Sequence, residues 1–386
     1  MDLKGRWVTF RVTQRPFSLA VYSRLSGLEA IFSAHVWNEP HPSEVRAQWT
    51  HYKGQPRLRN VIAIFLLISA QLLSALIAFS ASAQDLPTIR TLVPSILKVG
   101  KWAEGIADDG AALWVAESGQ RSVLRIARDG TTTRYPNVGR LPVGMVALPT
   151  GDIYSLVETD QIIWQPIAGS TKGRAVKWIG DCPQGLAADA QTLWVLTWPD
   201  CTSRNSRVVR LDPKTGAVTQ TASLGEWAQA IITGHGRVWV AHASKGHLDA
   251  ILPTSLAVET RAIDGASLWA LAVNRTALFA GGRLGDSIKQ GLIVSIDPQT
   301  GREEKRLPVD GMILAMVADE EAVVAINDTG TIYVVSAKGF TLKSTVTLSI
   351  GPYRPSSVLI RDDNLVIVAQ QYQGENGALL TVSHWR

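Results

Sequence analysis

The sequence lacks the motifs of the commonest enzyme classes. It contains no G-x-S-x-G, no P-loop, no H-E-x-x-H, and no G-x-G-x-x-G that follows a strand. Its two cysteines do not form a C-x-x-C pair, which argues against a reactive dithiol. These absences exclude the usual serine hydrolases, nucleotide-binding folds and zinc proteases. A functional site in this chain must therefore use residues outside these motifs.

An excess of positive charge is also missing from most of the chain. The full sequence has a formal net charge of +5, with nine Lys or Arg against four Asp or Glu in residues 1–83 and 29 of each in residues 84–386. A neutral remainder excludes nucleic-acid binding by electrostatic attraction. With 46% hydrophobic and 18% charged residues, the chain is not disordered and can bury a large core.

The one long hydrophobic run lies in residues 57–85, RLRNVIAIFLLISAQLLSALIAFSASAQD. Two arginines precede nineteen mostly apolar residues, and Ala81-Ser82-Ala83 follows them. This order predicts a secretory signal peptide cleaved before Gln84. Because a run of about 17–25 residues can span a bilayer, an uncleaved inner-membrane anchor over residues 61–79 is the alternative. Either way residues 84–386 are predicted to be exported, to the periplasm or the medium.

Residues 1–56 show aromatics and β-branched residues but no sustained periodicity and no helix caps. We expect them to be translated upstream sequence, with the true start near Leu58 or Val61, and the alternative is a short cytoplasmic tail before an anchor. The domain assignment is therefore an uninterpreted segment (1–56), a signal peptide or signal anchor (57–83) and one large domain (84–386).

A short hydrophobic strand recurs seven times in the large domain. Its central residues are spaced 40, 40, 45, 40, 45 and 43 apart: Trp114, Tyr154, Trp194, Trp239, Phe279, Val324 and Ile367. Each unit also has a small-residue strand before it, a polar loop and a third strand after it, then a turn such as DPKTG or DPQTG and a more polar fourth strand. Four short strands per 40–45 residues predict an all-β, seven-bladed β-propeller with the central residues packed between blades.

The ends of the chain predict how the ring closes. The last unit stops after its third strand, whereas TIRTLVPSILKV, residues 88–99, precedes the first unit. We therefore expect an N-terminal strand to complete the last four-stranded blade and to remove its open edge. Trimming residues 84–100 should then destabilise the whole ring.

One face of a propeller carries the loops after the second strands and the links between blades, and loops are where binding residues concentrate. The predicted ligand-binding rim consists of Trp102, Glu104, Arg121, Glu158, Trp198, Trp227, His242, Arg283, Asp328, Tyr353 and Tyr372. Cys182 and Cys201 map to the same rim in the third unit, and an exported chain with two cysteines is predicted to join them in a disulfide.

The first unit, LWVAESGQRSVLRIARDGTTTRYP, resembles the repeats of the streptogramin (virginiamycin B) lyase-like propellers, and the DPKTG and DPQTG turns resemble YVTN-type seven-bladed repeats. Active members of the lyase family open a cyclic depsipeptide ester by a metal-assisted elimination, which needs a histidine base and carboxylates. Here only Glu117 matches the family's glutamate after the aromatic strand. His242 is its equivalent in the fourth unit, and His242 and His247 are weak candidates for a divalent metal site.

Two functions of different classes follow. The first is a non-catalytic, monomeric binding or scaffold propeller for a peptide, glycan or envelope protein, without a cofactor and without membrane contact beyond an N-terminal anchor. The second is a divalent-metal-dependent lyase or hydrolase acting on a small cyclic ester or lactone, with Glu117 and His242 as catalytic candidates. The two differ in whether these side chains converge on one point or lie scattered around the ring.

Overall fold

The computed structural model describes residues 18–25, 28–35, 87–199, 201, 205–244, 246–349, 351, 353–371 and 374–386. The chain divides into two compact units, Met1–Ala83 and Gln84–Arg386. In the first unit, β1 (Ser18–Leu25) and β2 (Leu28–His35) form an antiparallel hairpin. The predicted signal or anchor segment lies outside the described residues. Nowhere in the described part of the chain is there a helix of the length and apolarity that a bilayer span requires.

The second unit consists of seven sheets, in each of which the consecutive strands of a blade pair antiparallel. The first three blades are β5 (Ala103–Asp108), β6 (Ala112–Glu117), β7 (Ser122–Ala127) and β8 (Thr132–Tyr135); β9 (Pro142–Ala147), β10 (Ile153–Val157), β11 (Ile162–Pro166) and β12 (Gly173–Trp178); and β13 (Cys182–Ala188), β14 (Leu193–Trp198), β15 (Arg207–Leu211) and β16 (Val218–Ser223). A three-residue 3-10 helix, η1 (Ser118–Gln120), follows β6.

The remaining four blades follow in chain order. They are β17 (Ala228–Gly234), β18 (Arg237–His242), β19 (His247–Ile251) and β20 (Val258–Ala262); β21 (Ala266–Val273), β22 (Leu278–Leu284), β23 (Gln290–Ile296) and β24 (Glu303–Asp310); β25 (Ile313–Ala318), β26 (Ala322–Asn327), β27 (Thr331–Ser336) and β28 (Leu342–Leu348); and β29 (Tyr353–Arg361), β30 (Asn364–Gln371) and β31 (Gly377–Val382). The seven-bladed propeller predicted from the repeat is confirmed.

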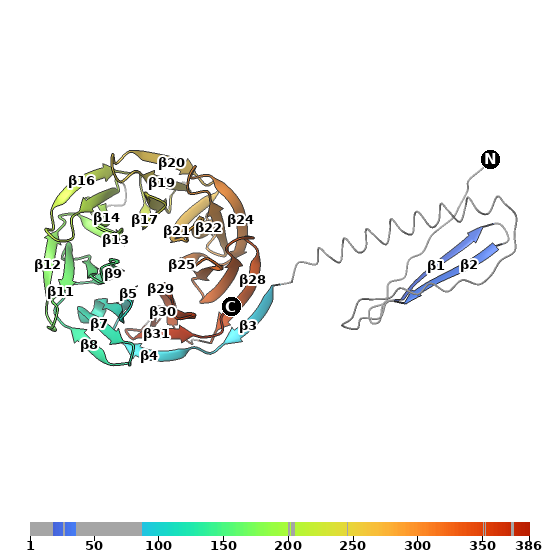
Figure 1. The fold of residues 1–386 in the computed structure, drawn as a ribbon, viewed down its shortest axis with the longest axis horizontal. Coiled ribbons are helices and arrows are strands. Elements are labelled where there is room, and N and C mark those ends of the chain that lie inside the picture. The colour runs from blue at the N-terminus through green and yellow to red at the C-terminus, as the bar shows by residue number, and fades with distance from the viewer. Residues whose placement is uncertain are drawn as a thin grey trace. The chain divides into compact units, whose positions relative to one another are not determined.

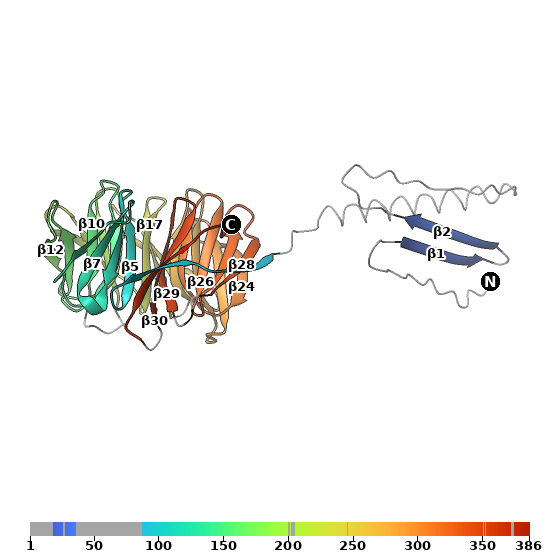
Figure 2. The same cartoon turned by 90° about the horizontal axis from the view of Figure 1, so that it is seen from below.

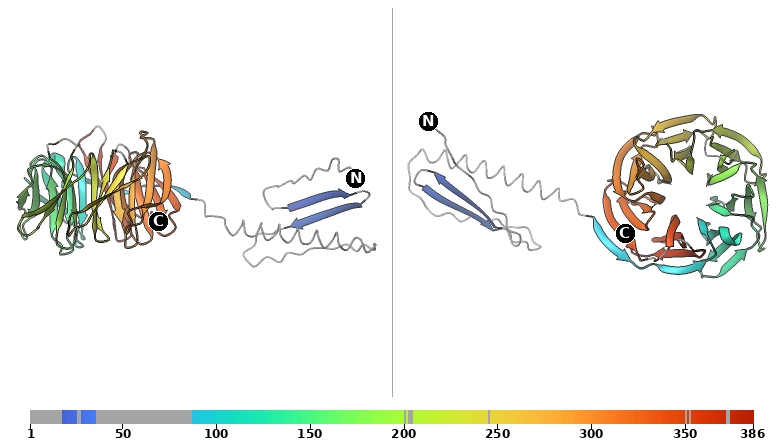
Figure 3. Two further views of the ribbon diagram at one scale, coloured as in Figure 1. Left: turned by 90° about the horizontal axis from the view of Figure 1, so that it is seen from above. Right: turned by 180° about the vertical axis from the view of Figure 1, so that it is seen from behind.

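The blades stand around a common axis, with the first strand of each blade innermost and the last strand outermost (Figures 1 and 3). All seven central residues of the repeat lie on second strands and are buried, with exposed fractions of 5% or less. They pack in apolar clusters that join one blade to the next: for example, Trp239 of blade 4 shares a cluster with Leu268 and Leu278 of blade 5. The core therefore lies between blades, as the repeat predicted.

The recurrent Asp-Pro turns have a defined local cause. In DPKTG the Asp212 carboxylate accepts the backbone N–H of Lys214 at 2.7 Å, and Gly216 adopts a φ of +70°. The Asp297 carboxylate accepts the N–H of Gln299 at 2.8 Å in the same way. A short acidic side chain and a glycine that tolerates positive φ thus fix the turn between the third and fourth strands.

Two N-terminal strands close the ring. The strand β4 (Ser95–Val99) pairs antiparallel with β31 and completes blade 7, so the predicted closure is confirmed. The strand β3 (Thr88–Leu92) pairs parallel with β28 as a fifth strand of blade 6, which the repeat did not predict. Both strands, cyan in Figures 1 and 2, follow the outer edge of the ring, and we call them the strap. All ring strands lie within residues 88–382, and residues 84–386 form the second compact unit of the chain.

The innermost strand of every blade is interrupted by a β-bulge at the same register position. The inserted positions are Glu104 with Gly105, Val143, Gln184, Gln229, Trp269, Leu314 and Ser356. The bulge of blade 1 includes the small residue Gly105, and in each of the other six blades a small residue follows the bulge. A Cβ added at Gly105 would lie 2.4 Å from the carbonyl oxygen of Val143 in the next blade. The bulges thus set the positions of seven half-buried side chains around the axis.

Candidate functional site

The strand register places the predicted rim residues on one face. In each blade the start of the inner strand pairs with the end of the second strand, as Ala103 does with Glu117 and Ala228 with His242. The links that enter the blades and the loops that follow the second strands therefore share one face of the ring. We call this face the rim face, and the candidate residues belong to it.

Glu117 is fully buried and holds the link that enters blade 1. One carboxylate oxygen accepts the backbone N–H of Gly100 at 2.7 Å, and the other accepts the Ser122 hydroxyl at 2.6 Å and the Arg134 guanidinium at 2.7 Å. Burial alone would raise the pKa of Glu117, but the bonds from Arg134, Ser122 and Gly100 outweigh it and hold the pKa below its usual value. This carboxylate is a structural anion with its acceptor positions already filled.

His242 holds the link that enters blade 4 in the same way. Its Nδ1 lies 2.8 Å from the backbone carbonyl of Glu226 in the link, and its Nε2 lies 2.9 Å from Oδ2 of Asp249. Both partners are hydrogen-bond acceptors, so the buried ring bridges the link and the Asp249 carboxylate. The Thr260 hydroxyl donates to the other Asp249 oxygen at 2.6 Å. Burial would raise the pKa of Asp249, but the bonds from His242 and Thr260 lower it.

The two histidines that the sequence suggested as metal ligands lie close together, but their geometry does not suit a metal ion. Single donor atoms of His242, His247 and Asp249 lie within 4.8 Å of one another. However, the two imidazoles are stacked, with centroids 3.8 Å apart and planes inclined by only 25°. A metal binds an imidazole in the plane of the ring at about 2.1 Å, and two nearly parallel stacked planes do not meet at that distance. The residues present therefore do not fit a metal ion in this arrangement.

The most accessible aromatic pair on the rim face joins blades 3 and 4. The indoles of Trp198 and Trp227 meet edge to face, with centroids 6.3 Å apart and planes at 71°. Trp198 donates its Nε1–H to the carbonyl of Ala228 at 3.1 Å, and Trp227 is 45% exposed. Trp227 has a positive φ of 58°, unusual for a bulky residue, and its carbonyl accepts the N–H of Ala243 at 2.8 Å. We call this pair the tryptophan site.

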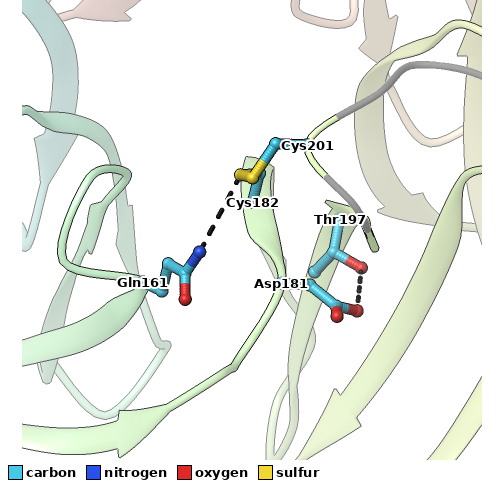
Figure 4. Close-up of a disulfide and its surroundings, with 5 residues drawn as sticks. All are labelled: Gln161, Asp181, Cys182, Thr197 and Cys201. Atoms are coloured by element: carbon cyan, nitrogen blue, oxygen red, sulfur yellow. Dashed lines mark hydrogen bonds between the residues drawn. A yellow bond between two sulfur atoms is a disulfide. The ribbon is translucent and has the colours of Figure 1, made fainter.

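Two sets of contacts, one in blade 3 and one in blade 4, hold the tryptophan site in position. The predicted disulfide between Cys182 and Cys201 is present and ties the loop after Trp198 back to the start of β13, where Cys182 pairs with Trp198 in register (Figure 4). Thr197, beside Trp198, donates to the Asp181 carboxylate at 3.1 Å. On the other side, the His242 bond to the Glu226 carbonyl holds the residue next to Trp227. The site is therefore preorganised from both blades.

A second feature of the rim face is a pair of carboxyls from blades 1 and 2. Burial, and then the charge of Glu158, raise the pKa of Glu104 to about 7. Burial also raises the pKa of Glu158. Glu104 is one of the bulge residues of the inner strands, so the bulge places an acid near the ring axis where water solvates it poorly. Near neutral pH Glu104 is therefore only partly ionised.

The other predicted rim residues are distributed around the ring and do not form one site. Trp102 in blade 1 is 42% exposed, with a φ of 49° close to that of Trp227, but among the described residues no aromatic ring packs against it. Arg121 ends the 3-10 helix of blade 1, Arg283 lies at the end of β22, and Tyr353 packs against the core between blades 6 and 7. Asp328 lines a groove between blades 5 and 6. Tyr372 lies outside the described residues.

Some residues of the site could not be found from the sequence pattern. Thr260 lies on a polar outer strand and the Glu226 contact uses a backbone carbonyl, so neither carries a motif. The half-buried residues Gln184 and Gln229 lie at the bulges near the start of the inner strands β13 and β17. A sequence signal for them does exist, since each stands one position before a small residue, Gly185 or Ala230.

Comparison with known proteins identifies the fold. No family model matches the sequence, and no curated protein matches it. Among solved structures, a streptogramin B lyase superposes with a TM-score of 0.58 at 12% identity, covering 75% of this chain and 98% of the lyase. A virginiamycin B lyase from Staphylococcus aureus gives a TM-score of 0.57 at 12% identity, covering 75% of this chain and 99% of that one. The chain is thus a seven-bladed propeller similar in fold to these lyases.

Proposed function

We propose that this chain is an exported, non-catalytic binding propeller whose tryptophan site recognises the flat apolar face of a ligand, either a sugar ring of a glycan or a proline or aromatic side chain of a peptide. The observation that supports it most is the exposed Trp227 indole, fixed against Trp198 by contacts from two blades. Tryptophan offers a large rigid contact area at little entropic cost and is enriched where binding energy concentrates. An envelope protein or the glycan of the envelope would supply such a ligand.

The placement of Glu117 and His242 favours binding over catalysis. They belong to blades 1 and 4, and each has local partners that occupy its donors or acceptors. A general base must reach a substrate proton, and neither side chain is solvent-exposed. The catalytic machinery expected from the lyase resemblance is therefore not assembled from these two residues.

The experiment is a thermal-shift and pull-down screen of residues 84–386 against glycans and proline-rich or aromatic peptides, followed by two matched variants. Trp227→Ala should weaken the selected ligand at least about tenfold, the scale of a buried aromatic anchor. Trp102→Ala is the control because Trp102 has similar exposure and the same left-handed backbone but lies in blade 1. Equal effects of the two substitutions, or none from Trp227→Ala, would refute the tryptophan site.

The alternative function is a divalent-metal-dependent lyase or hydrolase. The observation in its favour is the gathering of His242, His247 and Asp249. Unfolding would be followed with added Mg²⁺, Mn²⁺ or Zn²⁺, with and without chelator, and with His242→Ala. A metal-dependent rise in melting temperature that His242→Ala abolishes would support this alternative, and cyclic depsipeptide opening would then be assayed.

A further inference from the structure

A second surface lies away from the tryptophan site, in a groove between blades 5 and 6. Its volume is about 880 Å³, within the range of ligand-binding clefts. Val309 and Ile288 line it from blade 5, Tyr333 and Leu342 from blade 6, and Ile89 from the strap. Two of these side chains are highly exposed for their size, Ile89 at 84% and Ile288 at 56%. Exposed aliphatic side chains from separate blades that line one groove are typical of an interaction surface.

The groove also carries two acidic side chains and one basic one. Asp310 and Asp328 both line it, and no ion pair of either is found among the described residues. The Oδ1 atom of Asp328 is buried without a hydrogen-bond partner. Burial, and then the charge of Asp310, raise the pKa of Tyr333 in the groove, and Asp328 adds to the shift. The single basic residue that lines the groove is the exposed Lys289. A buried carboxylate oxygen without a donor favours a cationic partner.

The backbone at the groove is suited to an extended chain. In the described part of the protein β24 is the outermost strand of blade 5 and pairs only with β23. On the neighbouring blade 6 the strap already adds a strand in this way, because β3 pairs with the outer edge of β28. An extended peptide presents alternate side chains to opposite sides, so one side can meet the apolar residues and the other the carboxylates.

We propose that the groove between blades 5 and 6 binds an extended peptide segment of a partner protein in which basic and aliphatic side chains alternate. The aliphatic side chains contact Ile89 and Ile288, and a lysine or arginine pairs with Asp328. Since β3 supplies Ile89, the site is complete only when β3 is paired with β28. This surface is separate from the tryptophan site and does not depend on the function proposed there.

The test uses residues 84–386 and a fluorescein-labelled nonapeptide of alternating valine and lysine, with a valine–glutamate peptide as control. Fluorescence anisotropy should show binding of the lysine peptide that weakens with salt, and none of the glutamate peptide. Asp328→Asn keeps the side-chain shape and removes the charge, and it should weaken binding about tenfold. Ile288→Ser should weaken it as well, whereas Ile167→Ser, which changes an exposed isoleucine of blade 2, should not.

Three results would overturn the proposal. Equal binding of the two peptides would show that charge does not select the ligand. Unchanged affinity in both Asp328→Asn and Ile288→Ser, when melting temperatures show that both are folded, would place binding elsewhere. Binding of the small amphiphile dodecyltrimethylammonium without binding of the lysine peptide would make the groove a small-molecule site.

Discussion

Glu117 and His242 occupy the same position in two different blades. Each ends the second strand of its blade, pairs in register with the residue before the inner-strand bulge, and bonds to the link that enters the blade. Thr197 and Asn327 repeat the arrangement in blades 3 and 6, with Thr197 bonded to the Asp181 carboxylate and Asn327 to the Asp310 carbonyl. A polar side chain at this position thus helps to join the inner strand and the link to the blade.

The His242–Asp249 pair predicts acid sensitivity. Burial would raise the pKa of Asp249, but the bonds from His242 and Thr260 lower it overall. A carboxyl with a lowered folded-state pKa adds stability above the pKa of the unfolded chain, about 3.9, and this stability is lost as the pH falls through the folded value. Asp249→Asn should therefore lower the melting temperature by several degrees at pH 7 and flatten its fall below about pH 4.

Thermal unfolding across pH would measure this effect. Asp152→Asn is a suitable control because Asp152 is exposed and its carboxylate bonds only to Thr150 among the described contacts. If the two variants unfold alike at pH 7, the buried pair does not stabilise blade 4.

The raised pKa of Glu104 predicts the opposite dependence of stability on pH. Its folded-state pKa is about 7, raised by burial and by Glu158, whereas an unfolded glutamate has a pKa of about 4.3. Folding therefore favours the protonated form, and stability falls as the pH rises from about 4.3 to about 7. Glu104→Gln should melt at a higher temperature than the parent at pH 8 and at about the same temperature at pH 4. Glu158→Gln should give a smaller gain, and a destabilised Glu104→Gln at pH 8 would contradict the assignment.

Much of the fold could be predicted from the sequence because it depends on local and periodic signals. The 40–45-residue period predicts the blades, and the recurrent DPKTG and DPQTG turns are fixed by bonds from the local backbone to Asp212 and Asp297. The disulfide follows from two cysteines placed on one rim. The parallel pairing of β3 with β28 could not be predicted, because TIRTL has no partner signal until blades 6 and 7 are in place.

The candidate site was predictable in its residues but not in its arrangement. Trp198 and Trp227 both belong to the predicted rim, yet their contact depends on how blade 3 packs against blade 4. Glu117 matched a catalytic pattern because a carboxylate at the end of a strand looks the same in sequence whether it faces a ligand or a link. Its partners Gly100 and Arg134 lie 17 residues before and after it, and only the folded blade brings them together.

The disulfide should support both stability and binding. Cys182 and Cys201 are separated by 19 residues, and closing a loop of this size stabilises by about 3 kcal/mol in the chain-entropy account. We expect the double variant Cys182→Ser, Cys201→Ser to lose about that much unfolding free energy in urea, and to weaken binding at the tryptophan site because the loop beside Trp198 is released. Reductant should reproduce both effects in the parent and neither in the double variant. Full stability of the reduced parent would contradict this role.

The strap predicts a difference between two truncations. A chain that begins at Pro94 lacks β3 but keeps β4, so blade 6 returns to four strands and blade 7 stays complete. It also loses the bonds from Arg90 to the carbonyls of His384 (3.1 Å) and Trp385 (2.7 Å), which hold the C-terminus. A chain that begins at Lys101 lacks β4 too, which exposes the edge of β31 and opens the ring.

The first truncation should therefore lower the melting temperature modestly, and the second should yield an aggregating or unfolded protein. Arg90→Ala in the uncut chain separates the loss of its bonds from the loss of the strand, and it should cost less than removal of β3. These outcomes can be read from thermal unfolding and size-exclusion chromatography. A stable monomer beginning at Lys101 would mean that blade 7 does not need β4, because the packing of its three remaining strands between blades 6 and 1 would then suffice to hold the ring closed.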